Sequence, residues 1–454
     1  MLIRASLLSA PSLQELRFEA DGGLVVDGKG SITDVGAFES VAARHPGLAI
    51  QDLRPFWILP GLVDLHAHLP QYEAVAADGL ELLPWLERHI FPAEARFADG
   101  AHARATARTY LRDALSLGTT TMVLYATIHA EATDVIFQEA EACGVRAVIG
   151  KTMMDRHAPE ALCEDTEASL RESEELCCTW HGRDGGRLQY AFTPRFAPSC
   201  SRELMLGAGR LAQRYDAFIQ THLAENLQEL EWVRGLFPEA DSYTDVYRRS
   251  GLLGPRTLLG HGIHLAPAER RVLRESGSHL VHCPSSNAFL QSGTMPLRKW
   301  LEEGLSVGLG TDVGAGPSLS MFREMGEACT ASKLKRAAQH VQSARLSQVS
   351  GLTDDQKVLA SEALDLAPGP ALDAAGAFFL ATRGGARALS LGDRLGALEP
   401  GFDADFLVVD VRLSDPFGQI LTNPAQVLSR LLYRSDPRMV QAAYVRGRRC
   451  FHRA

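Results

Sequence analysis

The chain has 454 residues, 46% of them hydrophobic, and its 46 lysine and arginine residues against 55 aspartate and glutamate residues give a net charge of −9. This acidic balance argues against nucleic acid or an anionic membrane as a main partner. Residues 1–10 do not resemble a secretory signal, and the sequence contains no apolar stretch long enough to span a bilayer. We therefore expect a soluble, cytoplasmic protein with a large core.

The eight cysteines are scattered along the chain, and no two of them form a Cys-x-x-Cys pair. Without an export signal, this usage is typical of reduced thiols. Cytidine-deaminase-type folds hold zinc with a His-x-Glu and a Pro-Cys-x-x-Cys motif. The missing pair excludes that class.

Both ends of the chain alternate short apolar runs with dense turn signals, first in residues 24–35 and again in residues 404–410 and 439–447. This pattern is typical of short strands. We expect the two ends to meet in one small β-sandwich, formed by residues 1–57 and 400–454. The domain between them would span residues 58–399.

The middle of the chain alternates apolar strands with amphipathic helices, the pattern of a parallel α/β fold. It predicts a (β/α)8 TIM-like barrel, with a doubly wound sheet as the alternative. Helices are expected at residues 101–116, 132–143, 226–236 and 266–276. The expected strands cover residues 62–66, 120–125, 147–151, 189–193, 218–222, 257–261, 279–283 and 307–312.

Beyond the last expected strand, residues 343–377 have helical character that is interrupted by Pro368-Gly369-Pro370. We expect helices joined by a loop. The segment around residues 334–377 could take part in dimer contacts or cover a site, and the sequence does not decide between the two.

Polar residues stand at the ends of several expected strands. His66 and His68 end the first strand, and side chains two apart on a strand point to the same side. His222 ends the fifth strand, His261 the sixth and Asp312 the eighth. A single histidine at a strand end is more often a hydrogen-bonded core residue. Barrel enzymes, however, place their catalytic residues at these strand ends. Imidazole is also a ligand suited to zinc and similar metals.

This pattern predicts a metal site with His66, His68, His222 and Asp312 as ligands. His261 lies either beside the metal-bound water or at the edge of the ligand shell. A bound divalent ion can lower the pKa of water from 15.7 to about 7, which makes hydroxide available near neutral pH.

Glu225, three residues after His222, could move a proton from this water to a substrate. A structural role at the start of the following helix is the alternative, and both can hold. Asp312 could also accept the water proton.

Five motifs together resemble the amidohydrolase superfamily: P-G-L-V-D-L-H-A-H at 60–68, T-H-L-A-E-N at 221–226, H-G at 261–262, H-C-P-S-S-N at 282–287 and G-L-G-T-D at 308–312. Within it, the guanine deaminase family is the closer resemblance. H-L-P-Q-Y at 68–72, L-L-P-W-L at 82–86, F-P-A-E at 91–94 and T-P-R-F at 193–196 carry it. The resemblance covers about residues 58–330.

The resemblance implies hydrolytic deamination of guanine to xanthine and ammonia by a cytoplasmic homodimer. It implies one zinc per subunit, with iron as the other candidate, on the ligands named above, with His261 close by. Lys151 is then structural. His129, His264 and His282 receive no role.

The resemblance also implies how the purine is held. Guanine offers the acceptors O6 and N7, which the planar fork of an arginine can bond together. We expect Arg195 to do this, Gln71 to contact the ring edge, and Phe196 and Trp85 to pack around the ring. His261 completes the predicted substrate contacts.

The implied mechanism is attack of hydroxide on C2 while Glu225 protonates a ring nitrogen such as N3. His261 and Asp312 stabilise or deprotonate the attacking oxygen. Because residues 334–377 form a longer segment than the family usually carries, a related purine, pterin or triazine ring remains the alternative substrate. A noncatalytic barrel is a further alternative, disfavoured because every ligand is present.

Overall fold

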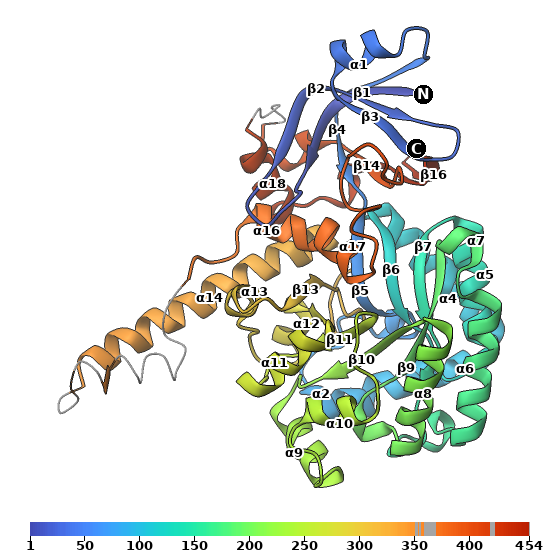
Figure 1. The fold of residues 1–454 in the computed structure, drawn as a ribbon, viewed down its shortest axis with the longest axis vertical. Coiled ribbons are helices and arrows are strands. Elements are labelled where there is room, and N and C mark those ends of the chain that lie inside the picture. Colours follow the sequence, from blue (N-terminus) through green and yellow to red (C-terminus); the bar gives the residue numbers. More distant parts are fainter. Residues whose placement is uncertain (350–352, 354–355, 358–368, 418–422, 454) are drawn as a thin grey trace.

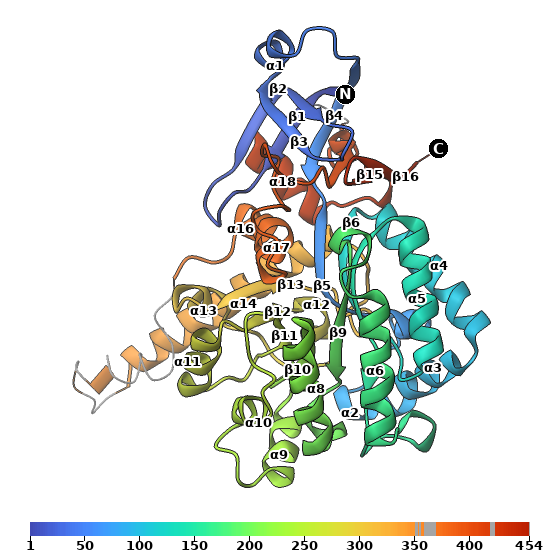
Figure 2. The ribbon, with the colours of Figure 1, turned by 45° about the vertical axis from the view of Figure 1, so that its right-hand side comes forward.

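The computed structural model describes residues 1–349, 353, 356–357, 369–417 and 423–453. The chain forms a barrel with outer helices, and a separate sheet from the two chain ends sits beside it (Figure 1). The same two units are seen after a turn of 45° (Figure 2). Among the described helices, none combines the length and the apolar character needed to cross a membrane.

Eight parallel strands form a nearly closed barrel, which confirms the predicted fold. In chain order they are β5 (Leu62–His68), β6 (Thr119–Tyr125), β7 (Arg146–Gly150), β9 (Leu188–Pro194), β10 (Phe218–Leu223), β11 (Thr257–His261), β12 (His279–His282) and β13 (Ser306–Leu309). A two-residue strand that the sequence pattern missed, β8 (Thr152–Met153), pairs with β9. Strands such as β5 and β6 are buried along their whole length, as expected for a sheet covered on both faces.

Hydrogen bonds join β5 to the residues that follow β13, the two strands at the ends of the sheet. The Asp312 N–H donates to the His66 carbonyl at 2.7 Å. Asp64, 2% exposed, accepts from the Thr311 N–H at 2.9 Å and from the Thr311 hydroxyl at 2.6 Å. These bonds hold the end of β5 beside the residues that follow β13.

Helices alternate with the strands and cover the outside of the barrel (Figure 2). The four expected helices are present as α4 (Gly100–Ser116), α5 (Ala130–Cys143), α9 (Leu227–Leu236) and α11 (Pro267–Ser276). The other helices of the barrel region are α2 (Leu82–Trp85), α3 (Phe91–Ala95), α6 (Thr166–Trp180), α7 (Arg183–Gly186), α8 (Arg202–Tyr215), α10 (Tyr243–Arg249), α12 (Pro284–Phe289), α13 (Leu297–Glu302), α16 (Ala374–Phe379) and α17 (Gly385–Ala388).

The helix α14 (Met321–Ser347) projects from the body of the molecule (Figure 1). Its first part is buried, and its later part carries exposed apolar residues such as Leu334 and Val341. Within the predicted segment 343–377, helical structure continues in α14 to residue 347 and is found again in α16 from residue 374. Residues 350–352, 354–355 and 358–368, including Pro368, lie outside the described residues.

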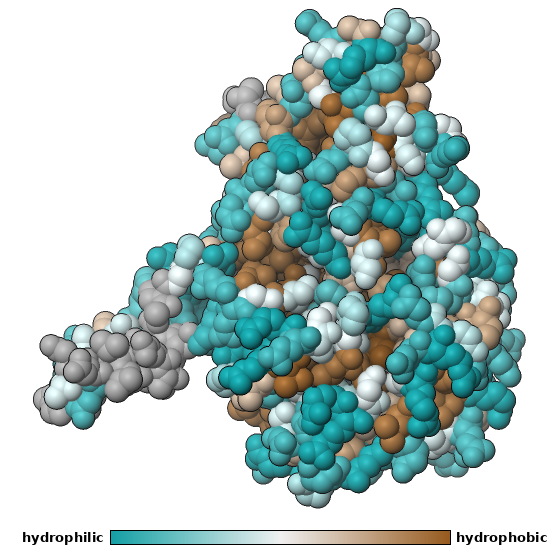
Figure 3. All heavy atoms as spheres, viewed as in Figure 1, coloured by the Kyte–Doolittle hydropathy of each residue, from teal (hydrophilic) through white to brown (hydrophobic). Residues whose placement is uncertain are grey.

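The two chain ends form one mixed sheet of seven strands, which confirms that they meet in a small β domain. Ile3, Ile58, Phe406 and Tyr444 belong to its buried core. Figure 3 shows hydrophilic side chains over most of one face of the molecule, with hydrophobic patches between this sheet and the barrel. The strands and accompanying helices are β1 (Leu2–Ser9), β2 (Arg17–Val26), β3 (Ile32–Ala37), α1 (Phe38–Arg44), β4 (Ile50–Pro60), β14 (Phe406–Val409), α18 (Pro424–Tyr433), β15 (Val440–Val445) and β16 (Arg448–His452). The boundaries at residues 57/58 and 399/400 stay predictions.

A buried ion pair joins the barrel to this sheet. Arg146 at the start of β7 has a side chain that is 2% exposed. Its Nη2 lies 2.9 Å from Asp403, and its Nε lies 3.1 Å from Asp405. These aspartates precede β14, so the contact links two parts of the chain more than 250 residues apart.

We expect Arg146→Ala to lower the free energy of unfolding by about 3–5 kcal/mol, because it leaves two carboxylates poorly compensated at a buried interface. Urea unfolding followed by circular dichroism measures the change. Arg44→Ala, which removes an exposed pair with Asp34, is the control and should have little effect. Equal losses in the two variants would contradict this account of the interface.

Candidate active site

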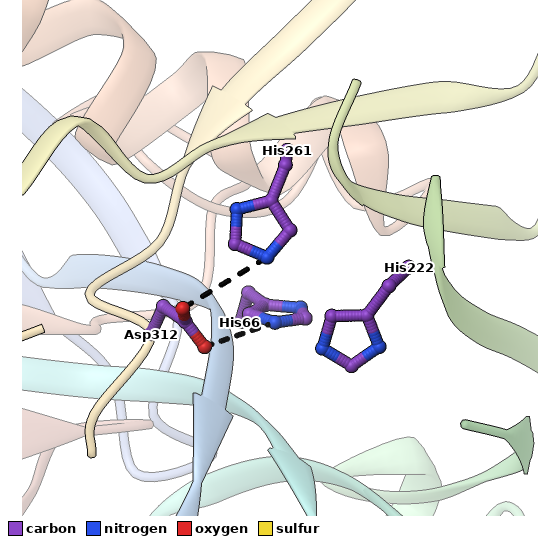
Figure 4. A group of neighbouring side chains, drawn as sticks. All are labelled: His66, His222, His261 and Asp312. Carbon is purple, nitrogen blue, oxygen red and sulfur yellow. Dashed lines mark ion pairs between the residues drawn. The ribbon is translucent and has the colours of Figure 1, made fainter. Parts of the chain in front are cut away.

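Side chains from four barrel strands converge at the carboxyl end of the barrel (Figure 4). One ligand atom from each of His66, His222, His261 and Asp312 lies within 4.8 Å of the others. His68 joins them, since its Nε2 lies 3.1 Å from Nε2 of His222 and 3.3 Å from Oδ1 of Asp312. The structure thus brings together all five residues that the sequence pattern singled out.

Gly260 on β11 and Gly310 just after β13 leave room for His66. A Cβ on Gly260 would lie 2.7 Å from Cε1 of His66, and a Cβ on Gly310 would lie 2.7 Å from Cβ of His66. His261 and Asp312 follow these glycines with positive φ angles of 65° and 49°. Such backbone conformations are uncommon outside glycine and concentrate at functional sites.

Two imidazoles form a hydrogen bond to a protein oxygen through Nδ1, the nitrogen that points away from the cluster. Nδ1 of His222 lies 2.6 Å from the Arg195 carbonyl, and Nδ1 of His261 lies 2.9 Å from Oδ1 of Asn287. A carbonyl oxygen only accepts, so Nδ1 of His222 carries the proton and its Nε2 keeps a lone pair. Hydrogen bonds of this kind orient histidine ligands in metal sites.

The donor set fits a divalent cation. Nε2 of His66 is buried and, within the described part of the chain, has no hydrogen-bond partner, although Asp312 Oδ1 lies 3.2 Å away. A buried nitrogen without a partner is costly unless something satisfies it. A cation among these nitrogens and the Asp312 carboxylate would do so, and imidazole with carboxylate is a common ligand set for zinc.

Burial favours the neutral form of His68 and His222, which is the form of imidazole that binds metal. It lowers the pKa of His68 to about 4, and it lowers the pKa of His222 well below its usual range, with the neighbouring histidines adding to the effect. Burial alone would raise the pKa of Asp312, but the neighbouring residues His66, His68 and His261 outweigh this effect and hold the pKa well below the usual range. Asp312 is therefore ionised, and the Ser286 hydroxyl donates to its Oδ2 at 2.6 Å.

Glu225 faces the same cluster from the loop after β10. Its Oε2 lies 3.4 Å from Nε2 of His261, and its Oε1 accepts from the Ser292 hydroxyl at 2.9 Å. Burial, together with the charge of Asp312, raises the pKa of Glu225 to about 8. A carboxyl group with a pKa near neutrality can both take up and release a proton there.

The predicted substrate residues line one pocket next to the cluster. Gln71, Trp85, Arg195 and Phe196 contribute to its walls. The remaining lining residues are His68, Leu82, Leu86, His222, Glu225, Glu229, His261, Leu290, Asp312 and Ala315. Every predicted substrate contact therefore shares a cavity with the candidate metal ligands.

The sequence pattern missed Glu229, which supports Glu225. Its Oε2 accepts from the N–H groups of Glu225 and Asn226 at 2.9 and 3.2 Å, and its Oε1 accepts from the Tyr243 hydroxyl at 2.8 Å. Asn226 caps α9 and forms a capping box with Glu229. The Asn-x-x-Glu spacing at residues 226–229 is the sequence signal that predicts this box.

Other candidates lie outside the cluster. Lys151 is buried and pairs with Glu164 and Glu172, in agreement with the structural role expected for it. His264 bonds the Ser292 carbonyl at 2.8 Å. Tyr125, which the sequence pattern also missed, packs its ring 4.4 Å from that of His68 and has a buried hydroxyl with no hydrogen-bond partner among the described residues.

Comparison with known proteins agrees with this geometry. The Amidohydrolase family matches residues 57–450. A guanine deaminase of Escherichia coli (strain K12) is 37% identical over 444 residues, covering 96% of this chain and 93% of that protein. A guanine deaminase of Homo sapiens is 33% identical over 401 residues, covering 86% of this chain and 82% of that protein. The crystal structure of guanine deaminase from C. acetobutylicum, with bound guanine in the active site, has a TM-score of 0.88 at 33% identity and covers 99% of both chains.

The chain therefore belongs to the amidohydrolase family, a family of metal-dependent enzymes. Within it, the relatives that span most of the chain at 33–37% identity are guanine deaminases. The predicted resemblance is confirmed at both levels.

We expect the purified protein to carry one divalent ion per chain and His66→Ala to lose it, because the variant removes a buried nitrogen of the donor set. Elemental analysis by mass spectrometry after dialysis measures this. His279→Ala is a matched control, since His279 lies at the opposite end of a barrel strand and bonds Ser306 and Pro255. An ion retained at full stoichiometry in His66→Ala would contradict the assignment.

Proposed function

We propose that the chain is a guanine deaminase that converts guanine and water to xanthine and ammonia with a bound zinc ion. One observation carries this proposal. A single pocket combines the histidine–aspartate cluster with the proton carrier Glu225 and the purine-reading pair of Arg195 and Gln71. The guanine deaminases to which the chain is similar support the same conclusion.

Four residues would hold the cation, namely His66, His68, His222 and Asp312. Three imidazoles and a carboxylate suit zinc, and the same set also accepts iron. When bound, the cation supplies Lewis acidity that lowers the pKa of a coordinated water toward neutrality. His261, which belongs to the same group of donors, would then face the reacting oxygen.

Arg195 and Gln71 would hold the substrate. Arg195 is 4% exposed and Gln71 is 2% exposed, so their polar groups act in a nearly dry pocket where hydrogen bonds discriminate strongly. The Arg195 guanidinium donates to guanine O6 and N7. Phe196 and Trp85 supply apolar walls for the ring.

Glu225 would move the proton that the reaction requires. C2 of guanine gains an oxygen from water and loses its amino group as ammonia, so one water proton ends on ring nitrogen N3 and the other on the departing amino group. The Glu225 pKa of about 8 lets this carboxyl group hold a proton near neutral pH and release it to a ring nitrogen such as N3. Asp312 and His261 stabilise or deprotonate the attacking oxygen. We also infer a cytoplasmic homodimer, as the family resemblance implies.

We expect the protein to release ammonia from guanine and to lose that activity after dialysis against a chelator, with recovery on addition of zinc. Coupled detection of ammonia measures both steps across a panel of guanine, 8-oxoguanine, isoxanthopterin and a triazine. Faster turnover of another ring than of guanine would contradict the substrate assignment. Full activity in the metal-free protein would contradict a metal-dependent hydrolysis.

We expect Glu225→Gln to keep its metal while turnover falls about 10²- to 10⁴-fold, because the amide cannot carry the proton. Elemental analysis and steady-state kinetics on one preparation separate the two effects. Glu231→Gln, on the exposed face of α9, is the control and should match the unmodified protein. Near-normal turnover in Glu225→Gln would refute the assigned role.

A further inference from the structure

A buried carboxylate beside the pocket has no role in the mechanism described so far. Glu94 lies in the short helix α3, and its side chain is 3% exposed. Its two oxygens accept from Nη1 of Arg195 at 2.8 and 2.7 Å. Its Oε1 also accepts from Nε2 of Gln71 at 2.8 Å. One carboxylate thus contacts both polar side chains assigned to the substrate.

The contact leaves part of the Arg195 guanidinium available. Glu94 engages Nη1 alone, and within the described residues no side-chain hydrogen bond uses Nε or Nη2 of Arg195. A buried guanidinium requires a counter-charge, and Glu94 is the carboxylate that supplies it. The N–H groups on Nε and Nη2 of Arg195 therefore keep a fixed direction and can donate to a ligand.

The contact also fixes which way the Gln71 amide points. A carboxylate only accepts hydrogen bonds, so the amide nitrogen of Gln71 must face Glu94. The amide oxygen then faces the other way, where it accepts a hydrogen bond from the Gly314 N–H at 3.4 Å. Reversing the amide would set two oxygens against each other. Glu94 therefore decides whether Gln71 offers the pocket an acceptor or a donor.

We propose that Glu94 is a specificity-determining positioning residue, which holds Arg195 and Gln71 in the one arrangement that reads a 6-oxopurine. The proposal rests on the proposed function. Arg195 donates to the exocyclic carbonyl oxygen O6, and the oxygen of Gln71 accepts from the adjacent N1–H. A purine without the 6-oxo group has neither partner, so the arrangement disfavours it.

The purine 2-aminopurine tests this role because it keeps the 2-amino group and lacks O6. In the unmodified protein, kcat/KM should favour guanine strongly over 2-aminopurine. In Glu94→Gln, KM for guanine should rise and the guanine preference should fall about tenfold or more, because Arg195 and Gln71 lose their common anchor. The value for 2-aminopurine should change little. A purely structural role would lower kcat/KM for both purines alike.

The control removes a comparable glutamate elsewhere. Glu139 has a side chain that is 8% exposed and pairs with Arg104 and Arg108 between the outer helices α4 and α5. Glu139→Gln should therefore perturb the fold in a similar way while the guanine preference stays unchanged. A preference that falls equally in both variants would overturn the proposal.

Two further variants test the role of Glu94. Glu94→Asp retains a carboxylate and should retain more of the guanine preference than Glu94→Gln, so it serves where the amide variant does not fold. In an Arg195→Gln background, Glu94→Gln should have little additional effect on the preference, because the two residues act together. Independent, additive effects would overturn the proposal.

The outcomes also separate this inference from the proposed function. A wild-type chain that releases no ammonia from guanine refutes the proposed function. An active wild-type chain in which Glu94→Gln lowers kcat/KM equally for guanine and 2-aminopurine refutes only the role of Glu94.

Discussion

Several imidazole nitrogens and one carboxylate in this protein are directed at one small buried space. Nδ1 of His222 and Nδ1 of His261 already bond protein oxygens, and Nε2 of His66 has no hydrogen-bond partner among the described residues. Neutral imidazoles cannot satisfy one another fully, because each needs a donor for its lone pair. A single cation would satisfy these nitrogens and balance the charge of Asp312. The closed barrel, with Gly260 and Gly310 beside His66, holds the set together.

Buried carboxyl groups then divide the pocket into parts with different chemistry. Glu225 has few compensating partners, so its pKa rises to about 8 and it can carry a proton. Asp312 is surrounded by histidines and stays ionised. Glu94 is paired with Arg195 and acts through it on the substrate. In the proposed mechanism the same kind of side chain serves proton transfer, metal binding and positioning, depending on its neighbours.

The sequence predicts the barrel and the cluster well because both follow from local pattern. Several apolar strands carry a histidine at or near their end, and parallel strands in a barrel bring their ends together. The contact between Glu94 and Arg195 is different, since 101 residues separate them and the path of the loop that carries α3 decides it. The pairing of Arg146 with Asp405 spans 259 residues and depends on how the terminal sheet docks. Such contacts have no periodic signal in the sequence.

The central claim is that histidines from several strands surround one cation. X-ray absorption at the zinc edge on the purified enzyme tests it most directly. The account predicts a shell of nitrogen and oxygen at about 2.0–2.2 Å that contains several imidazoles and no sulfur. A sulfur shell at about 2.3 Å, or a fit without imidazole, would contradict it.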